Sequence, residues 1–227
     1  MSSANPTGSA AVVFDLDGVL LDSEGLHYQA YCQVLREFDV VIGQEEYAEH
    51  WIGAGHGPEY AVERYRLPIT PTELRARKAP LYRELLHTRA QLMPHARDVV
   101  EGLYREFALG VATNSGREDV DWVLARFDLR RFFSAVIARE DYREAKPAPD
   151  AYVAVRALLA VPAHRCLVVE DSPRGVLAAR AAGLPVVAVP NEFTRVCVFP
   201  PGTPRIAGLS AVTPAFVRAQ LDRADGG

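Results

Sequence analysis

Five short apolar runs constrain the fold of this chain more than any other feature of the sequence. They are rich in valine, nearly continuous rather than alternating, and occupy residues 11–14, 109–112, 134–138, 166–169 and 185–189. Continuous apolar runs of this length are typical of parallel strands that are covered on both faces. Helix-length segments follow the later runs, at residues 117–127, 149–159 and 173–182. This alternation predicts a doubly wound α/β domain built on a parallel sheet.

The region between the first and second runs has a different pattern. It contains no strong strand run, and amphipathic stretches predict helices at residues 26–38, 45–51, 59–65 and 71–86. A glycine-rich loop at 52–58 interrupts them. We therefore expect an α/β core over residues 10–24 and 94–227, a small α-helical cap domain inserted after the first strand over residues 25–93, and a disordered leader over residues 1–9. A last helix is expected over 211–223, whereas the proline-rich segment 191–208 receives no assignment.

Composition excludes several classes of function. The net charge of −4 and the pI of about 5.9 give no electrostatic footprint for nucleic acid. No apolar run is long enough to span a membrane, and the N-terminus lacks the features of a secretory signal. The three cysteines are too widely spaced to resemble a metal ligand set or a disulfide framework, so we expect a reducing, cytoplasmic setting. No protein partner is implied.

Two acids, Asp15 and Asp17, directly follow the first apolar run. Carboxylates at the end of a buried strand are costly unless something pairs with them, and Mg²⁺ is a natural partner because it takes oxygen ligands. Gly18 lets the backbone turn sharply beside them. The combination points to a carboxylate nucleophile held against a metal and a phosphate. The structural alternative is a strand that ends in a common Asp-Gly turn.

Polar side chains also follow the other strand runs. Ligands of an open α/β sheet bind beyond the carboxyl ends of the strands, so residues at these ends are expected to meet in one crevice. After the later runs the sequence carries Thr113, Asn114, Ser115, Glu140, Lys146, Glu170, Asp171 and Ser172. Together with the first two acids, this set contains a nucleophile, metal ligands and donors for phosphate oxygens.

In this order, the segments at residues 15–23, Thr113, 146–150 and 169–172 resemble the four motifs of the haloacid dehalogenase-like hydrolase superfamily. The resemblance extends from residue 11 to residue 189 and implies a Rossmann-like core with a type-1 helical cap. The most similar branch contains β-phosphoglucomutase-like enzymes and phosphatases of small metabolites. The motifs are specific for the superfamily but not for a substrate.

The resemblance implies a role for each motif residue. Asp15 would attack phosphorus, and Asp17 would protonate the leaving alkoxide and then activate water. Thr113 would hold a phosphoryl oxygen, with Asn114 and Ser115 beside it, and Lys146 would neutralise charge on Asp15 and the phosphoryl group. Two of these positions have simpler alternatives, because Thr113 could cap the helix at 117–127 and Lys146 could be a solvated turn residue.

The resemblance also implies a Mg²⁺ site. Its ligands would be Asp15, the backbone carbonyl of Asp17, and Asp171, with Glu170 as a further candidate. Glu170 could instead be a strand-end carboxylate that does not touch the metal.

Cap residues carry weaker signals. His27 lies early in the cap on a helix expected to point at the cleft, and Lys78 falls where the phosphomutase branch has a cap lysine that reaches the active site. Both could simply be solvated. The loop at 53–57 is expected to touch substrate, but it lacks the arginine with which phosphomutases hold a distal phosphate, and only Lys78 and His56 are nearby candidates.

These observations favour a Mg²⁺-dependent phosphatase that acts on a small phosphorylated metabolite through an aspartyl-phosphate. The alternatives are a β-phosphoglucomutase-like isomerase with the same core and a non-catalytic binding protein on the same fold. Asp17 argues against a haloacid dehalogenase, in which the resemblance predicts a non-acidic residue at that position.

Overall fold

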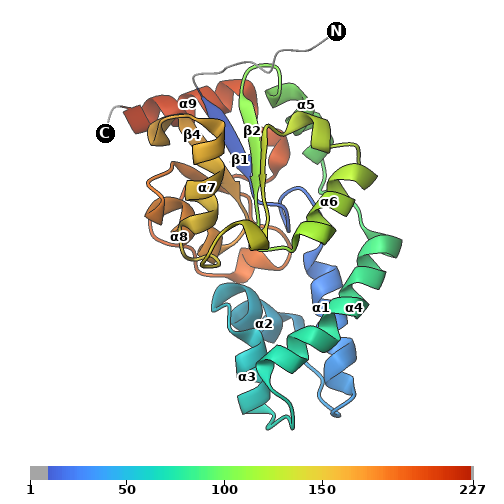
Figure 1. The fold of residues 1–227 in the computed structure, drawn as a ribbon. Coiled ribbons are helices and arrows are strands. Elements are labelled where there is room, and N and C mark those ends of the chain that lie inside the picture. Colours follow the sequence, from blue (N-terminus) through green and yellow to red (C-terminus); the bar gives the residue numbers. More distant parts are fainter. Residues whose placement is uncertain (1–9, 226–227) are drawn as a thin grey trace.

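The computed structural model describes residues 10–225, so the leader expected at residues 1–9 lies outside the described part. Its centre is a five-stranded sheet in the order β3-β2-β1-β4-β5, in which all neighbours are parallel (Figure 1). The strands are β1 Ala11–Phe14, β2 Ala108–Ala112, β3 Ala135–Ile137, β4 Cys166–Glu170 and β5 Val186–Ala188. All five predicted strands are therefore present, each within one residue of its expected bounds.

Helices cover both faces of the sheet, which explains why the strand runs are continuously apolar. Val12 and Phe14 of β1 belong to a cluster with α5, α6 and α9, whereas Ala11 and Val13 belong to a cluster with α7 and α8. These helices are α5 Ala96–Leu103, α6 Arg117–Arg126, α7 Asp150–Leu159, α8 Pro173–Ala181 and α9 Pro214–Asp225. The doubly wound α/β core is confirmed, while α5 was not expected from the sequence.

The remaining helices gather beyond the carboxyl ends of the strands (Figure 1). They are α1 Glu24–Arg36, α2 Gln44–Tyr47, α3 Gly57–Arg64 and α4 Pro71–Arg89. They enclose a hydrophobic cluster of their own, centred on residues such as Val34, Ile42 and Leu74. We call this group the cap. The helix expected at 45–51 is divided, because α2 continues as a π-helical segment, Ala48–Gly53.

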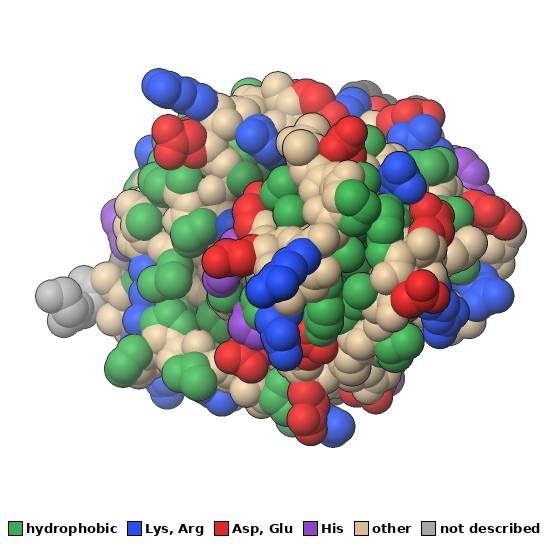
Figure 2. Space-filling model, turned by 90° about the horizontal axis from the view of Figure 1, so that it is seen from below, with side chains coloured by type: hydrophobic (Ala, Val, Ile, Leu, Met, Phe, Trp, Pro, Cys, Tyr) green, Lys and Arg blue, Asp and Glu red, His purple; other side chains and the backbone are tan. Residues whose placement is uncertain are grey.

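Short 3₁₀ turns connect the main elements, at Arg130–Phe132, Arg139–Asp141, Ala163–Arg165, Thr194–Val196 and Leu209–Ala211. The last of these turns occupies the start of the segment in which a terminal helix was expected. Within residues 10–225, no helix has both the length and the apolar composition needed to cross a bilayer. Seen from the cap end, the surface carries acidic and basic side chains interspersed rather than a field of one sign (Figure 2).

Candidate active site

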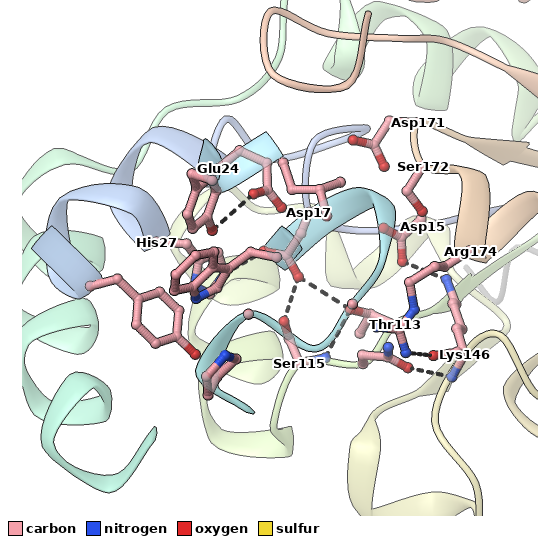
Figure 3. A pocket seen from close by; sticks show the side chains of 18 of the residues that line it. Asp15, Asp17, Glu24, His27, Thr113, Ser115, Lys146, Asp171, Ser172 and Arg174 are labelled. Atoms are coloured by element: carbon pink, nitrogen blue, oxygen red, sulfur yellow. Dashed lines mark hydrogen bonds and ion pairs between the residues drawn. The ribbon is translucent and has the colours of Figure 1, made fainter. Parts of the chain in front are cut away.

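A cavity of about 400 Å³ lies between the carboxyl ends of the strands and the cap. Figure 3 shows the side chains that point into it from both parts of the structure. From the core it is lined by Asp15, Asp17, Thr113, Asn114, Ser115, Lys146, Glu170, Asp171, Ser172 and Arg174. From the cap it is lined by Glu24, His27, Tyr31, Tyr47, Trp51, Ile52, Gly55, Gly57, Pro58, Arg75 and Lys78. The residues to which the sequence assigned catalytic, phosphate-binding or metal-binding roles all line this cavity, but Glu140 and His56 do not. Glu140 instead accepts a 2.8 Å hydrogen bond from the backbone N–H of Arg117 through Oε2.

Asp15 follows β1 and is 8% exposed. Its Oδ1 accepts a hydrogen bond of 2.8 Å from Nζ of Lys146, which leaves Oδ2 for another partner. Burial raises the pKa of Asp15 to about 8, against the opposing effect of the Lys146 charge. A further cation beside this carboxylate would reverse the shift, because a nearby positive charge favours the ionised form.

Lys146 is not a solvated turn residue, since only 4% of it is exposed. Its ammonium also lies 2.7 Å from Oε1 of Glu170, 2.9 Å from the carbonyl oxygen of Ala112 and 2.9 Å from the hydroxyl of Tyr152. The carboxylates of Asp15 and Glu170 hold the pKa of the lysine above its usual value despite its burial. Lys146 is therefore a fixed positive charge directly beside Asp15.

Glu170 is completely buried, and both of its oxygens are already bonded. Oε1 contacts Lys146 and accepts from Tyr152, while Oε2 accepts from the backbone N–H groups of Asp171 and Ser172 and from the Ser172 hydroxyl. Burial would raise the pKa of Glu170, but Lys146 and these donors lower it overall. The geometry suits a carboxylate that fixes Lys146 and the turn after β4.

Three buried acids, Asp15, Glu170 and Asp171, bring one oxygen each within 4.8 Å of one another. An all-oxygen set of carboxylates is the chemistry that Mg²⁺ prefers. Burial first, and then the charges of Glu170 and Asp15, raise the pKa of Asp171 well above its usual value, so the single ammonium of Lys146 does not offset the three acids. These residues therefore fit a divalent cation. The Asp17 side chain points elsewhere, and only its backbone carbonyl remains a candidate ligand.

Two further residues shape the Asp171 side of this cluster. Gly18 has a φ of +74°, and a Cβ atom there would lie 2.3 Å from Oδ2 of Asp171. Asn191 donates a 2.7 Å hydrogen bond from Nδ2 to the same oxygen. Asn191 was missed because it follows β5 in a segment without a recognisable pattern. It orients Asp171 from the far side of the turn.

Asp17 is held by a ring of donors. Ser23 donates to Oδ1 at 2.6 Å, Thr113 donates to Oδ2 at 3.2 Å, and the Ser115 hydroxyl donates to the same oxygen. Burial would raise the pKa of Asp17, but hydrogen bonds from His27, Ser115 and Ser23 leave it well below its usual range. Asp17 is therefore an ionised carboxylate in this arrangement.

The residues after β2 connect the two acids to the rest of the pocket. Thr113 is 1% exposed and does not cap α6, whose N-cap is Gly116. Its hydroxyl accepts from the Ser115 backbone as well as donating to Asp17. Asn114 accepts through Oδ1 from the backbone N–H of Lys146 at 3.1 Å. The three residues 113–115 thus present hydroxyl and amide groups to the cavity.

From the cap, His27 lies between Asp17 and Lys78. Its Nε2 is 3.7 Å from Oδ1 of Asp17, its Nδ1 contacts the Lys78 ammonium, and its ring stacks on Tyr82. Burial lowers the pKa of Lys78 to about 8. Glu24, which was not expected, accepts from the Tyr47 hydroxyl, and burial together with the Asp17 charge raises its pKa to about 7.

Two arginines also line the cavity and were missed in the sequence. Arg75 on α4 forms a double hydrogen bond with Glu59 at 2.6 and 2.7 Å. Arg174 on α8 lies only three residues after Asp171, so its place beside a motif was the available signal. The expectation that Lys78 and His56 are the only cations near the cap loop is therefore wrong, because Gly55 of that loop packs on Arg174.

Comparison with known proteins gives consistent matches. A family described as haloacid dehalogenase-like hydrolase matches residues 12–189. CbbY of Rhodobacter capsulatus is 30% identical over 213 residues, which cover 88% of this chain and 94% of that protein. Fructose-1-phosphate phosphatase YqaB of Escherichia coli (strain K12) is 30% identical over 185 residues, with 79% and 96% covered.

Comparison with solved structures agrees with the sequence matches. A crystal structure of a CbbY mutant from Rhodobacter sphaeroides in complex with xylulose 1,5-bisphosphate superimposes with a TM-score of 0.76 and 25% sequence identity. The match covers 88% of this chain and 95% of that one. The sheet and the cap thus occur together in a protein that binds a small phosphorylated sugar.

Proposed function

Because this chain belongs to the haloacid dehalogenase-like hydrolases, we propose that it is a Mg²⁺-dependent phosphatase that hydrolyses a small phosphorylated metabolite through an aspartyl-phosphate intermediate. Several of its relatives bear phosphatase names, fructose-1-phosphate phosphatase among them. The observation that carries the proposal is the buried pair of Asp15 and Lys146 beside a cluster of acids in the cavity between the core and the cap.

Asp15 is suited to act as the nucleophile. Its bond to Lys146 fixes Oδ1, so that Oδ2 can form the new bond to phosphorus while the bond to the leaving oxygen breaks. Lys146 keeps its positive charge throughout and stabilises the charge on the transferred group. Phosphoryl transfer relies mainly on such positioning and charge stabilisation.

Asp17 is suited to move the protons. A phosphoryl group that takes the hydroxyls of Thr113 and Ser115 would remove two of the hydrogen bonds that keep Asp17 ionised. The pKa of Asp17 then rises, which allows it to carry the proton that the leaving oxygen needs. Once ionised again, it accepts a proton from the water that attacks the phosphoaspartate, and phosphate is released.

Mg²⁺ would be held by Asp15, Asp171 and the backbone carbonyl of Asp17, and it would neutralise negative charge on the nucleophile and the phosphoryl oxygens. Glu170 is assigned a positioning role, because both its oxygens are engaged by Lys146, Tyr152 and the Ser172 turn.

We also propose that the protein is cytoplasmic. Its three cysteines are free thiols, as is usual for proteins of a reducing compartment.

The test is phosphate release from a panel of small phosphate esters in the presence of Mg²⁺. We expect Asp15→Asn to reduce turnover by more than about 10³-fold, as loss of a catalytic nucleophile does. Circular dichroism and thermal melting of this variant verify that the fold is intact. Near-normal phosphatase activity in a well-folded Asp15→Asn protein would overturn the assignment.

The phosphomutase alternative is kept because of one observation. Arg174 contacts the cap loop and provides a guanidinium there, so the missing arginine of that loop no longer argues against a bound bisphosphate. We expect phosphate release to outpace interconversion of β-glucose 1-phosphate and glucose 6-phosphate when glucose 1,6-bisphosphate is added. Rapid isomerisation with little free phosphate would replace the phosphatase assignment with the mutase.

A further inference from the structure

Arg174 lies where two parts of the site meet. It is in the first turn of α8, lines the cavity and points toward the loop that carries Lys146 (Figure 3). One of its terminal nitrogens, Nη2, donates to the backbone carbonyl of Lys146. A guanidinium has five N–H donors, so this bond leaves most of them for other partners.

The lysines and the other arginine of the cavity differ from Arg174 in their partners, since Lys78 contacts a ring nitrogen of His27 and the remaining two contact carboxylates. Lys146 contacts two carboxylates, and Nη2 of Arg75 donates to both carboxylate oxygens of Glu59. Among residues 10–225, no Asp or Glu oxygen lies within salt-bridge distance of the Arg174 guanidinium, and Glu59 attracts it only from farther away. Burial lowers the pKa of Arg174, which means that its charge is partly desolvated. Such a charge gains free energy when an anion binds beside it.

The cap loop is shaped to accept this side chain. Gly55 has a φ of +72°, and a Cβ atom there would lie 1.2 Å from Nη1 and 2.1 Å from Cζ of Arg174. Only glycine can both adopt this conformation without strain and leave room for the guanidinium. The loop that lacks an arginine of its own therefore packs directly on one supplied by the core.

Lys146 contacts both Asp15 and Arg174, which indicates how far Arg174 lies from the reacting group. The ammonium of Lys146 bonds Asp15, where the transferred phosphoryl group would sit, and the carbonyl of the same residue bonds Arg174. The two positive groups are thus separated by about one lysine side chain. A molecule with a few carbon atoms between two anionic groups could reach both.

We propose that Arg174 determines substrate specificity by binding a second anionic group, a phosphate or a carboxylate, at the end of the substrate remote from the transferred phosphoryl group. The inference rests on the proposed phosphatase function and names the class of substrate for that site. The planar fork of arginine pairs with two oxygens of either anion at once, which a lysine cannot do.

The experiment uses pairs of substrates that differ only at the remote end. Glycerol 3-phosphate is compared with 3-phosphoglycerate, and fructose 1-phosphate with fructose 1,6-bisphosphate. For each pair, kcat/KM of the member with an anionic remote end is divided by kcat/KM of the member with a neutral remote end to give a selectivity ratio. We expect the wild-type ratio to exceed one in at least one pair, and Arg174→Gln to lower that ratio by about tenfold to a hundredfold, mainly through KM.

Two other variants accompany Arg174→Gln. Arg174→Lys keeps the positive charge but loses the planar fork of the guanidinium, so its selectivity ratio should lie between those of the wild type and Arg174→Gln. If Arg174→Gln does not fold, the test uses Arg174→Lys instead. Arg180→Gln is the matched control, because Arg180 is an exposed arginine on the same helix whose guanidinium donates to the carbonyl of Pro201 and the hydroxyl of Thr203 at the surface. It should leave the ratio unchanged.

The possible failures are distinguishable. A wild-type ratio of one or less in every pair, or an equal loss for both members of a pair in Arg174→Gln, would overturn the role of Arg174. An equal loss would instead assign Arg174 to the transferred phosphoryl group or to the fold. Absence of Asp15-dependent phosphate release from all four compounds and from p-nitrophenyl phosphate would refute the phosphatase function itself.

Discussion

Replacement of Lys146 by methionine tests how much the ion pairs of the Lys146 ammonium contribute to stability. Methionine approximates the shape of the side chain but removes the ammonium, which lies 2.7 Å from Glu170 and 2.8 Å from Asp15. Burial already shifts Asp15 toward its neutral form, with a pKa of about 8. The main uncompensated charge in Lys146→Met is therefore the Glu170 carboxylate, which has no exposed surface.

The size of the effect follows from how Glu170 can respond. Without its partner, the carboxylate can escape its unpaired charge by taking up a proton. For a carboxyl with an ordinary pKa of 4.5, protonation costs about 3.4 kcal/mol at pH 7 and about 0.7 kcal/mol at pH 5, at about 1.36 kcal/mol per pH unit. These values limit the electrostatic part of the destabilisation and agree with the roughly 3–5 kcal/mol that loss of one partner of a buried ion pair costs.

The direction in which the stability loss changes with pH also follows from the titration of Glu170. In the wild type the pKa of Glu170 is depressed, so its contribution to stability is present above the ordinary value of 4.5 and is lost as the pH falls through the folded-state pKa. In Lys146→Met the buried carboxyl of Glu170 is instead protonated in the folded state, so its pKa is raised above 4.5 and the cost of keeping that proton grows as the pH rises from 5 to 7. The difference in stability between the two proteins should therefore be about 3–4 kcal/mol at pH 7 and smaller by about 2–3 kcal/mol at pH 5.

Urea unfolding in excess chelator, at both pH values, measures this difference without a contribution from metal. The double variant Lys146→Met/Glu170→Gln is the internal control, since it removes both charges and should lose less stability than the two single losses combined. A loss below about 1 kcal/mol at pH 7, or equal losses at the two pH values, would refute the reasoning that Lys146 is the counter-charge of Glu170.

Three further predictions concern the metal and its surroundings. Activity should be lost in excess chelator, return with Mg²⁺ and be inhibited by Ca²⁺, because Ca²⁺ accepts more oxygen ligands at longer distances and can occupy both oxygens of Asp15; full activity in chelator would contradict the metal site. Asn191→Ala should raise the Mg²⁺ concentration needed for half-maximal activity by about tenfold or more, since it removes the 2.7 Å bond that orients Asp171, and an unchanged Mg²⁺ titration would exclude that role. Gly18→Ala should reduce kcat by more than about tenfold at saturating Mg²⁺, because its Cβ would lie 2.3 Å from Asp171 at a φ of +74°; a wild-type rate would show that the turn can relax.

The helices of the cap show what amphipathic spacing in the sequence can and cannot predict. Its helices could be located from amphipathic spacing, but the sequence could not divide the stretch at 45–51 into α2 and a π-helical segment, and it missed the short helix α5 in the core. Hydrogen-bond registers of this kind depend on what packs against the helix. The assignment of residues 25–93 to a separate domain remains a prediction.

The sequence by itself determined the strands and the identity of the acids and the lysine that the α/β core contributes to the pocket. Each of these residues lies at or shortly after the carboxyl end of a buried run, and the carboxyl ends of parallel strands meet at one edge of a sheet. Asp15, Thr113 and Asp171 could thus be brought together without knowledge of any contact between them. This inference needs only the order of strands and loops along the chain.

The tertiary structure alone decided which hydrogen-bond and packing partners these side chains have. It showed that Glu170 is occupied by Lys146 and Tyr152, that Asn191 holds Asp171, and that Arg174 fills the space left by Gly55. These contacts join residues 18 to more than 100 positions apart, and they depend on distances and directions between packed elements. Periodicity along one segment carries no information about them, because it records only which face of that segment is buried.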